Sequence, residues 1–147
     1  MAAGTVAGDR AREVWIVAAK RTPFGAFGGT LKDVKATDLG VAAAQAAIAE
    51  SAVAAADFDQ VIFGCVAQTT PEDVYAARHI GLRSGLPVEV PALTVNRLCG
   101  SGFQALISAA QEIRTGEADV CLVGGSSMST LVRCCWRSFS ARLVPRW

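Results

Sequence analysis

The sequence predicts an α/β fold in which a mainly parallel sheet is flanked by helices. Two observations support this prediction. Four short apolar runs alternate along the chain with segments of helical pattern, an order typical of a parallel sheet with right-handed crossovers. The runs are continuously apolar rather than alternating with polar residues, which indicates strands that are covered on both faces of the sheet.

The first half of the chain contains two of the predicted strands and one long helix. The strands are residues 14–19 and 61–66, and both should be fully buried. A loop rich in Pro and Gly follows the first strand. Thr37 and Asp38 can cap an alanine-rich helix that extends to about residue 54.

The second half contains two helices and the other two strands. Pro71 opens a helix that Gly85 can end. The third strand is predicted at residues 93–98 and the fourth at residues 120–125. Gly116 can end the helix between them. Apolar residues recur at helical spacing in that helix and should form its buried stripe: Phe103, Leu106, Ile107, Ala110 and Ile113.

Length and composition indicate one domain, or a piece of a larger one, with a substantial core. The chain has 147 residues, 52% of them hydrophobic, with a mean hydropathy of +0.35. We expect residues 1–12 to be a flexible tail and residues 13–130 to be the folded domain. Residues 131–147 contain four Arg and no acidic residue, which permits a basic interaction tail. Their chemistry differs so much from the rest that we expect an atypical Arg/Trp-rich tail outside the fold.

Charge and cysteine usage exclude several classes of partner. A net charge of +1 implies no nucleic-acid partner. The sequence has no apolar stretch of about 18 residues, so we expect no membrane span. The five cysteines show no CxxC pairing and no metal-ligand spacing, which predicts no metal site and favours a reducing, intracellular protein. They are Cys65, Cys99, Cys121, Cys134 and Cys135.

The segment 91–105 contains a cysteine at a predicted corner between a strand and a helix. A β-branched run leads directly into Cys99-Gly100-Ser101-Gly102, and an amphipathic pattern follows at once. The first N–H groups of a helix have no intrahelical partners and lie at the positive end of the helix dipole. A thiolate is stabilised there, so we expect Cys99 to be a nucleophile at neutral pH. Gly100 and Gly102 would let a bulky substrate approach the backbone.

Two other interpretations of this corner remain open. The pattern Gly100-x-Gly102-x-x-Ala105 also fits the dinucleotide-binding fingerprint. That fingerprint requires an acidic residue at the far end of the next strand, whereas the nearest candidate, Asp119, precedes it. A cofactor loop also gains nothing from a cysteine. In the second interpretation Cys99 is simply a buried thiol beside a tight turn.

Four stretches within residues 13–129 share the pattern of one family. They read Val-Ala-Ala-Lys-Arg-Thr-Pro-Phe-Gly at 17–25, Lys-Ala-Thr-Asp-Leu at 35–39, Ala-Ala-Arg-His-Ile-Gly-Leu at 76–82 and Asn-Arg-Leu-Cys-Gly-Ser-Gly-Phe-Gln at 96–104. In these stretches the chain resembles the N-terminal part of the thiolases, the acetyl-CoA C-acyltransferases, and most of all their mitochondrial 3-ketoacyl-CoA type. The resemblance implies a partial thiolase-like N-terminal domain.

The resemblance also implies a chemistry for Cys99. This residue matches the cysteine that thiolases acylate, and its backbone N–H would help to hold an oxyanion. The implied reaction is the thiolysis of a 3-oxoacyl-CoA, as in fatty acid β-oxidation, or the reverse Claisen condensation. Acyl-CoA and CoA would be substrates, with no cofactor. The family implies a homo-oligomer, which truncation could remove, and a mitochondrial location, with the cytoplasm as the alternative.

The chain departs from the family pattern in two respects. Thiolases have Gly-Gly-x-Glu-x-Met-Ser after the fourth strand, whereas residues 124–129 lack the Glu and are one residue shorter. The family's later segments, with an activating His and a second Cys, have no match. We therefore expect a truncated acyltransferase that is inactive alone. The alternative is a non-catalytic fragment that docks on a full-length thiolase, or an unproductive gene product.

Other reactive residues have plainer interpretations. His79, the only histidine, is expected to have a structural or interface role, because catalysis would require it beside Cys99. Cys65 and Cys121 lie in apolar runs and should be inert core residues. Lys20 and Arg21 could attract CoA phosphates, but a solvated loop is favoured.

Overall fold

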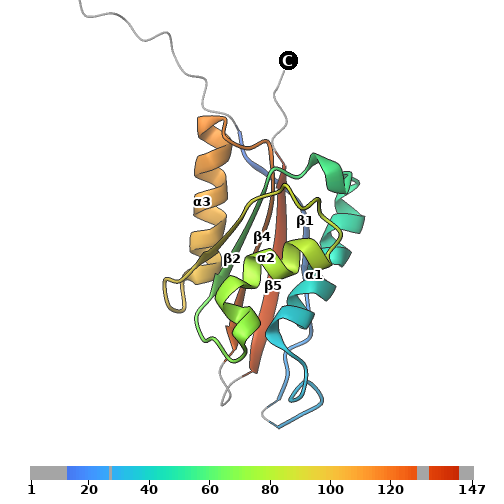
Figure 1. Cartoon of the computed structure of the whole chain (residues 1–147), viewed down its shortest axis with the longest axis vertical. Helices are drawn as coiled ribbons and strands as arrows, with labels where there is room; N and C mark the ends of the chain where they lie inside the picture. The colour runs from blue at the N-terminus through green and yellow to red at the C-terminus, as the bar shows by residue number, and fades with distance from the viewer. Residues whose placement is uncertain (1–12, 27, 129–132, 143–147) are drawn as a thin grey trace, which may run out of the picture.

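The computed structural model describes residues 13–26, 28–128 and 133–142 (Figure 1). For residues 127–128 and 133–142 it describes the backbone alone. The strands are β1 (Trp15–Arg21), β2 (Gln60–Cys65), β3 (Ala92–Val95), β4 (Val120–Met128) and β5 (Arg133–Arg142). The α-helices are α1 (Ala36–Ser51), α2 (Ala76–Arg83) and α3 (Ser101–Thr115), and the 3₁₀ helices are η1 (Ala55–Asp57) and η2 (Pro71–Tyr75). None of the described helices is long and apolar enough to cross a membrane.

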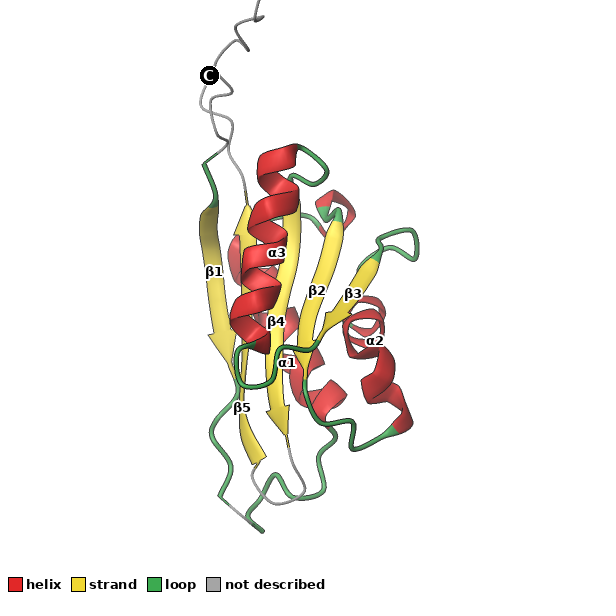
Figure 2. Ribbon diagram, turned by 90° about the vertical axis from the view of Figure 1, so that its left-hand side faces the viewer, coloured by secondary structure: helices red, strands yellow, loops and turns green. Residues whose placement is uncertain are grey.

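The five strands form one sheet in the order β1-β5-β4-β2-β3 (Figure 2). Strand β2 runs parallel to both of its neighbours, β3 and β4. Strand β5 runs antiparallel to β4 and to β1. Helix α3 covers one face of the sheet, and α1 and α2 cover the other. These findings confirm the predicted α/β fold with a mainly parallel sheet and flanking helices.

Strand β5 lies inside the sheet, whereas the sequence predicts that residues 131–147 stand outside the fold. Its register places Phe139 opposite Val123 on one side and opposite Ala19 on the other. Backbone N–H and C=O groups make this pairing, and any sequence without proline can supply them. The unusual composition of residues 131–147 was therefore a poor guide to the position of this strand. Residues 131–132 and 143–147 lie outside the described part.

Strand β1 is more exposed than its apolar sequence predicts. Trp15 is 55% exposed, and Ile16 and Val17 are exposed as well, whereas Ala18 is buried. The reason is its position, because among the described strands β1 lies at the edge and pairs with β5 alone. The prediction of a fully buried first strand is thus wrong for five of its six residues, since Ala19 is exposed and Val14 is half-buried as well. The strand itself is where the sequence predicts it.

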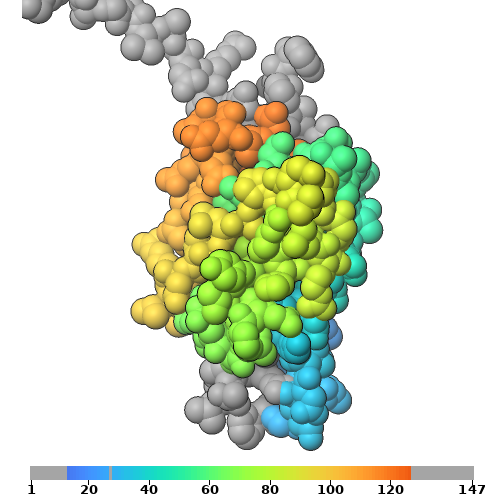
Figure 3. Space-filling model, viewed as in Figure 1, coloured from blue at the N-terminus to red at the C-terminus, as the bar shows by residue number. Residues whose placement is uncertain are grey.

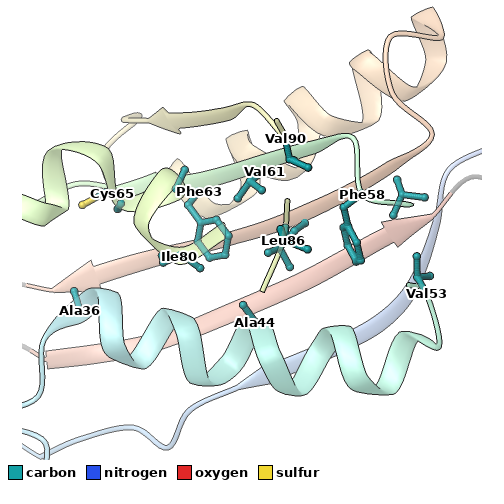
Figure 4. Close-up of a cluster of buried hydrophobic side chains, with 14 residues drawn as sticks. Ala36, Ala44, Val53, Phe58, Val61, Phe63, Cys65, Ile80, Leu86 and Val90 are labelled. Carbon is teal, nitrogen blue, oxygen red and sulfur yellow. The ribbon is translucent and has the colours of Figure 1, made fainter. Parts of the chain in front are cut away.

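Buried side chains lie on both faces of the central strands. The larger cluster fills the space between the sheet and helices α1 and α2 (Figure 4). Val61 and Phe63 point into it, whereas Ile62 belongs to the cluster beneath α3. A strand that buries alternate residues on opposite faces must be covered on both. This confirms that β2 is a covered strand, as the sequence predicts.

Helix α3 buries only part of the stripe that its apolar residues predict: Ile113 is buried and Leu106 packs against the same cluster, as predicted. Its fully buried residues are Ser101, Ala105, Ala109 and Ile113. Phe103, which the sequence assigns to the buried stripe, is 73% exposed, and Ile107 is exposed too. Small residues allow the helix to lie close to the sheet, so they occupy the contact face in place of the larger ones. Gly116 ends the helix in the left-handed conformation, as predicted.

Polar contacts join helix α1 to the segment before α2. Thr37 is buried and makes no cap bond, because its hydroxyl donates to Glu72 at 3.0 Å. Lys35 donates to the same carboxylate at 2.9 Å. These two hydrogen bonds hold the pKa of Glu72 below its usual value, and the Glu72 carboxylate raises the pKa of Lys35. The predicted capping role of Thr37 is therefore wrong, and its hydroxyl connects two elements of the fold.

Candidate functional site

Cys99 lies in the turn between β3 and α3. Strand β3 ends at Val95, and α3 begins at Ser101 with Gly100 as its N-cap. Cys99 is exposed. This contradicts the interpretation of a buried thiol and confirms the predicted corner between a strand and a helix. The turn lies at the left edge of the molecule in Figure 3, where its residues are coloured yellow to orange.

Two glycines on the strands bring the start of α3 against the sheet. A Cβ added at Gly64 of β2 would lie 2.6 Å from the carbonyl carbon of Ser101. A Cβ added at Gly125 of β4 would lie 2.6 Å from the Cα of Gly102. Real Cβ atoms do not come so close to backbone atoms, so both strands require glycine here. The first turn of α3 is thereby fixed at the carboxyl ends of two parallel strands.

Hydrogen bonds from side chains hold the backbone of the turn. The N–H of Leu98 donates to Oδ1 of Asn96 at 3.0 Å. The hydroxyl of Ser101 donates to the carbonyl oxygen of Leu98 at 2.6 Å and accepts from the N–H of Arg97 at 2.8 Å. Leu98 has a φ of 48°, in the left-handed region that residues with a Cβ seldom occupy. The residue before the candidate nucleophile is thus held in an unusual conformation.

The electrostatics of this turn suit a developing negative charge. The N–H groups in the first turn of an α-helix have no intrahelical acceptor. Those of Gly100 and Ser101 donate to the carbonyl oxygens of Arg97 and Leu98, which leaves the N–H groups that follow them in the first turn of α3. The dipole of α3 places its positive end at the same point. Donors at such a position stabilise a thiolate, or the oxyanion that forms when a carbonyl group is attacked. The geometry therefore fits nucleophilic acyl transfer by Cys99.

Gly100 and Gly102 have more space around them than the strand glycines. A Cβ at Gly102 would lie 3.7 Å from the Cα of Gly125, and one at Gly100 would lie 3.4 Å from the carbonyl oxygen of Arg97. These are ordinary contacts, so packing within the described residues does not demand glycine at either position. The approach of a substrate to these two residues remains a prediction.

The other two described cysteines are buried and electrostatically disfavoured as nucleophiles. Burial raises the pKa of the Cys65 thiol to about 11, and the nearby carboxylate of Asp73 adds to the effect. Burial likewise raises the pKa of Cys121 to about 12, with smaller contributions from Glu112 and Asp59. Both results agree with the prediction that these two are core residues. The side chains of Cys134 and Cys135 lie outside the described part.

We expect iodoacetamide to label Cys99 well before Cys65 and Cys121 in the folded protein. Alkylation requires an accessible thiolate, and both buried thiols have raised pKa values. Peptide mass mapping after a short exposure at neutral pH measures the order. Labelling in denaturant is the control and should make the three rates similar. Faster labelling of Cys65 or Cys121 in the native protein would contradict this account.

Several other residues named from the sequence lie away from the turn. His79 lies on α2, which covers the opposite face of the sheet from α3. Lys20 forms an ion pair with Glu50. The guanidinium group of Arg21 donates to the carbonyl oxygen of Thr22 at 3.2 Å and lies 5.0 Å from the ring centre of Phe24. The placement of His79 favours its structural interpretation. Lys20 and Arg21 lie in strand β1, not in the solvated loop that the sequence predicts.

The interpretation as a dinucleotide site does not fit the sheet. Asp119, its candidate acidic residue, directly precedes β4, whereas Gly102 packs against Gly125 further along that strand. The two features therefore lie at different ends of β4. No group of three or more His, Cys, Asp or Glu side chains in the described residues could hold a metal ion.

Sequence reasoning missed two polar residues of the turn. Asn96 and Ser101 belong to the motif at residues 96–104, but the sequence pattern alone assigns no role to either. Asn96 accepts a hydrogen bond from the residue two positions later, a pattern that asparagine commonly makes. That preference could have indicated its contact from sequence alone. The contact of Ser101 with Gly64 joins distant segments, and no local pattern predicts it.

Three comparisons with known proteins agree with one another. A family model described as "Thiolase, N-terminal domain" matches residues 14–142. Mitochondrial 3-ketoacyl-CoA thiolase from Homo sapiens is 55% identical over 124 residues, which are 84% of this chain and 31% of that protein. Beta-ketothiolase BktB from Cupriavidus necator is 49% identical over 80% of this chain and 30% of its own length.

Solved structures give the same result. The crystal structure of human mitochondrial 3-ketoacyl-CoA thiolase superposes with a TM-score of 0.76 and 56% identity, covering 78% of this chain and 29% of that one. The crystal structure of the same human enzyme in complex with CoA matches with the same TM-score, identity and coverage. Acetyl-CoA acetyltransferase from Bacillus anthracis also matches with a TM-score of 0.76, at 35% identity, covering 85% of this chain and 32% of that one. The chain spans about a third of the length of these relatives.

Proposed function

The chain belongs to the thiolase family, and on this premise we propose that Cys99 accepts an acyl group from a CoA thioester. The observation that carries the proposal is the position of the thiol. Cys99 is exposed in the turn at the positive end of α3, whereas Cys65 and Cys121 are buried with raised pKa values. Of the three described cysteines, it alone is exposed and lies beside the start of a helix.

In the proposed reaction the sulfur of Cys99 attacks the 3-oxo carbon of a 3-oxoacyl-CoA. An S–C bond forms, and the carbonyl electrons move to oxygen. The oxyanion is held by N–H groups at the turn. The carbonyl then re-forms as the bond between carbons 2 and 3 breaks, and the released acetyl-CoA carbanion takes up a proton. The thiolate of a second CoA finally displaces the acyl group from Cys99. The Claisen condensation reverses these steps.

The reaction needs proton transfers, and the described part of the chain places no histidine beside Cys99. The sequence contains one histidine, His79, and α2 holds it on the opposite face of the sheet from α3. General acid–base groups are typically worth about 10²–10⁴-fold in rate. We therefore propose that the chain undergoes acyl transfer at Cys99 at most slowly and shows no turnover of acetoacetyl-CoA with CoA above background.

The substrates and the location are part of the same proposal. Acyl-CoA and CoA are the substrates, with no further cofactor, and the structure of the human relative with CoA supports this choice. Mitochondrial 3-ketoacyl-CoA thiolases are among the most similar relatives, which supports a mitochondrial location. Their name also supports a role in the breakdown of fatty acyl chains. The exposed side chains of Phe103 and Ile107 support association with a second thiolase chain.

Prolonged incubation with acetyl-CoA, followed by peptide mass mapping, tests the proposal. We expect an acetyl adduct on the peptide that contains Cys99. No adduct is expected on the peptides of Cys65 and Cys121, nor after Cys99 has been blocked with iodoacetamide. Cys99→Ser is the matched variant and should remove the adduct. If acetylation is absent, or falls mainly on other residues, Cys99 is not the acceptor and a non-catalytic docking role becomes the better account.

A further inference from the structure

We propose that Ser101 and Asn96 are positioning residues that place the Cys99 thiol by holding Leu98 in its left-handed conformation. This inference deepens the proposed function and rests on it for the role of Cys99. The two side chains bind the backbone of the residue that immediately precedes the nucleophile. They therefore act on Cys99 through Leu98.

The conformation of Leu98 is not explained by the packing of its own side chain. Its φ of 48° is unfavourable for a residue with a Cβ. Burial of the leucine side chain could offset such a cost, but Leu98 is 71% exposed. An exposed leucine gains little from this backbone geometry. Strained backbone persists where the surrounding structure holds it in place, and here that structure consists of hydrogen bonds.

Both backbone polar groups of Leu98 are bound by neighbouring side chains. Its N–H donates to Oδ1 of Asn96 at 3.0 Å. Its carbonyl oxygen accepts from the hydroxyl of Ser101 at 2.6 Å and from the backbone N–H of Ser101 at 3.0 Å. The Ser101 hydroxyl also accepts from the N–H of Arg97 at 2.8 Å. One buried hydroxyl thus connects the two residues before Cys99 to the start of α3.

Ser101 is itself fixed by the sheet. Ser101 is 2% exposed, and a Cβ added at Gly64 would lie only 2.7 Å from the Cβ of Ser101. Little space remains in which Ser101 could move away from β2. Ser101 therefore positions Leu98, Cys99 and the start of α3 against strand β2. If the Ser101 bond is lost, Leu98 can relax and carry the thiol away from the helix N-terminus.

The rate of Cys99 alkylation by iodoacetamide in the folded protein tests this inference. Ser101→Ala removes both hydrogen bonds of the hydroxyl, the one to the Leu98 carbonyl oxygen and the one from the Arg97 N–H, and should slow labelling at least about three- to tenfold. Ser101→Ala is then combined with Leu98→Gly in one double variant and with Leu98→Ala in another. Glycine adopts positive φ without a steric penalty, so the slowing should be largely suppressed in Leu98→Gly. In Leu98→Ala the Cβ remains, and the slowing should persist.

A second pair of variants covers the case in which Ser101→Ala does not fold. Asn96→Ala should also slow labelling, whereas Asn96→Ser keeps an oxygen that can accept the Leu98 N–H and should restore much of the rate. Circular dichroism confirms that each variant is folded. Wild-type labelling in Ser101→Ala, or equal slowing in the Leu98→Gly and Leu98→Ala backgrounds, would overturn the inference. Alkylation needs no acyl-CoA, so its outcome is independent of the acyl-transfer experiment.

Discussion

Removing residues 131–147 should abolish the cooperative thermal unfolding of this protein. The deletion takes away β5, which pairs with β4 along one side and with β1 along the other. Among the described strands β1 pairs with β5 alone, so it would keep only its contacts with helix α1. The deletion would also expose the backbone of β4 as an open edge. We expect a broad, non-cooperative melt by circular dichroism, together with aggregation.

A shorter deletion provides the matched control. Removing 143–147 leaves every residue of β5 in place, because the strand ends at Arg142. This variant should melt cooperatively, close to the full chain. A sharp transition at an unchanged midpoint after deletion of residues 131–147 would show that β5 contributes nothing to stability. In that case the sequence-based expectation of a dispensable tail would be correct.

The elements that the sequence predicts well are those whose pattern is local. The runs at β2 and β4 are apolar because both faces of these strands are covered, and the glycine after α3 is where a left-handed residue ends the helix. Strand β5 carries no such pattern, since its place depends on antiparallel backbone pairing with β4, which directly precedes it, and with the distant β1. Backbone pairing of this kind cannot be read from periodicity.

The exposed and buried faces were harder to predict for the same reason. Trp15 is apolar but lies on an edge strand, and Phe103 has helical spacing but points away from the sheet. Hydrophobicity shows that a residue prefers burial, and it does not show whether a neighbouring element is there to cover it. In the site, the position of Cys99 followed from a local corner pattern. The contacts of Asn96 and Ser101 required the folded geometry.

Replacing Gly64 with alanine should destabilise the fold and disturb the Cys99 turn together. The new Cβ would lie 2.6–2.7 Å from three atoms of Ser101, two of them in the backbone. Because backbone atoms cannot rotate away, either β2 or the start of α3 must shift. Overpacking of this kind typically costs about 1–3 kcal/mol. We expect a lower free energy of unfolding in urea and slower alkylation of Cys99.

Gly102→Ala is the matched control, since it adds the same methyl group to the other side of this contact region. Its Cβ would lie 3.7 Å from the Cα of Gly125, which is an ordinary distance. Alanine in a helix is favoured over glycine by about 0.5–1 kcal/mol, so this variant should be as stable as the wild type or slightly more stable. If Gly64→Ala unfolds at the same urea concentration as Gly102→Ala, the close contact between β2 and α3 does not hold the turn in place. The position of Cys99 would then have to depend on the hydrogen bonds of Asn96 and Ser101 alone.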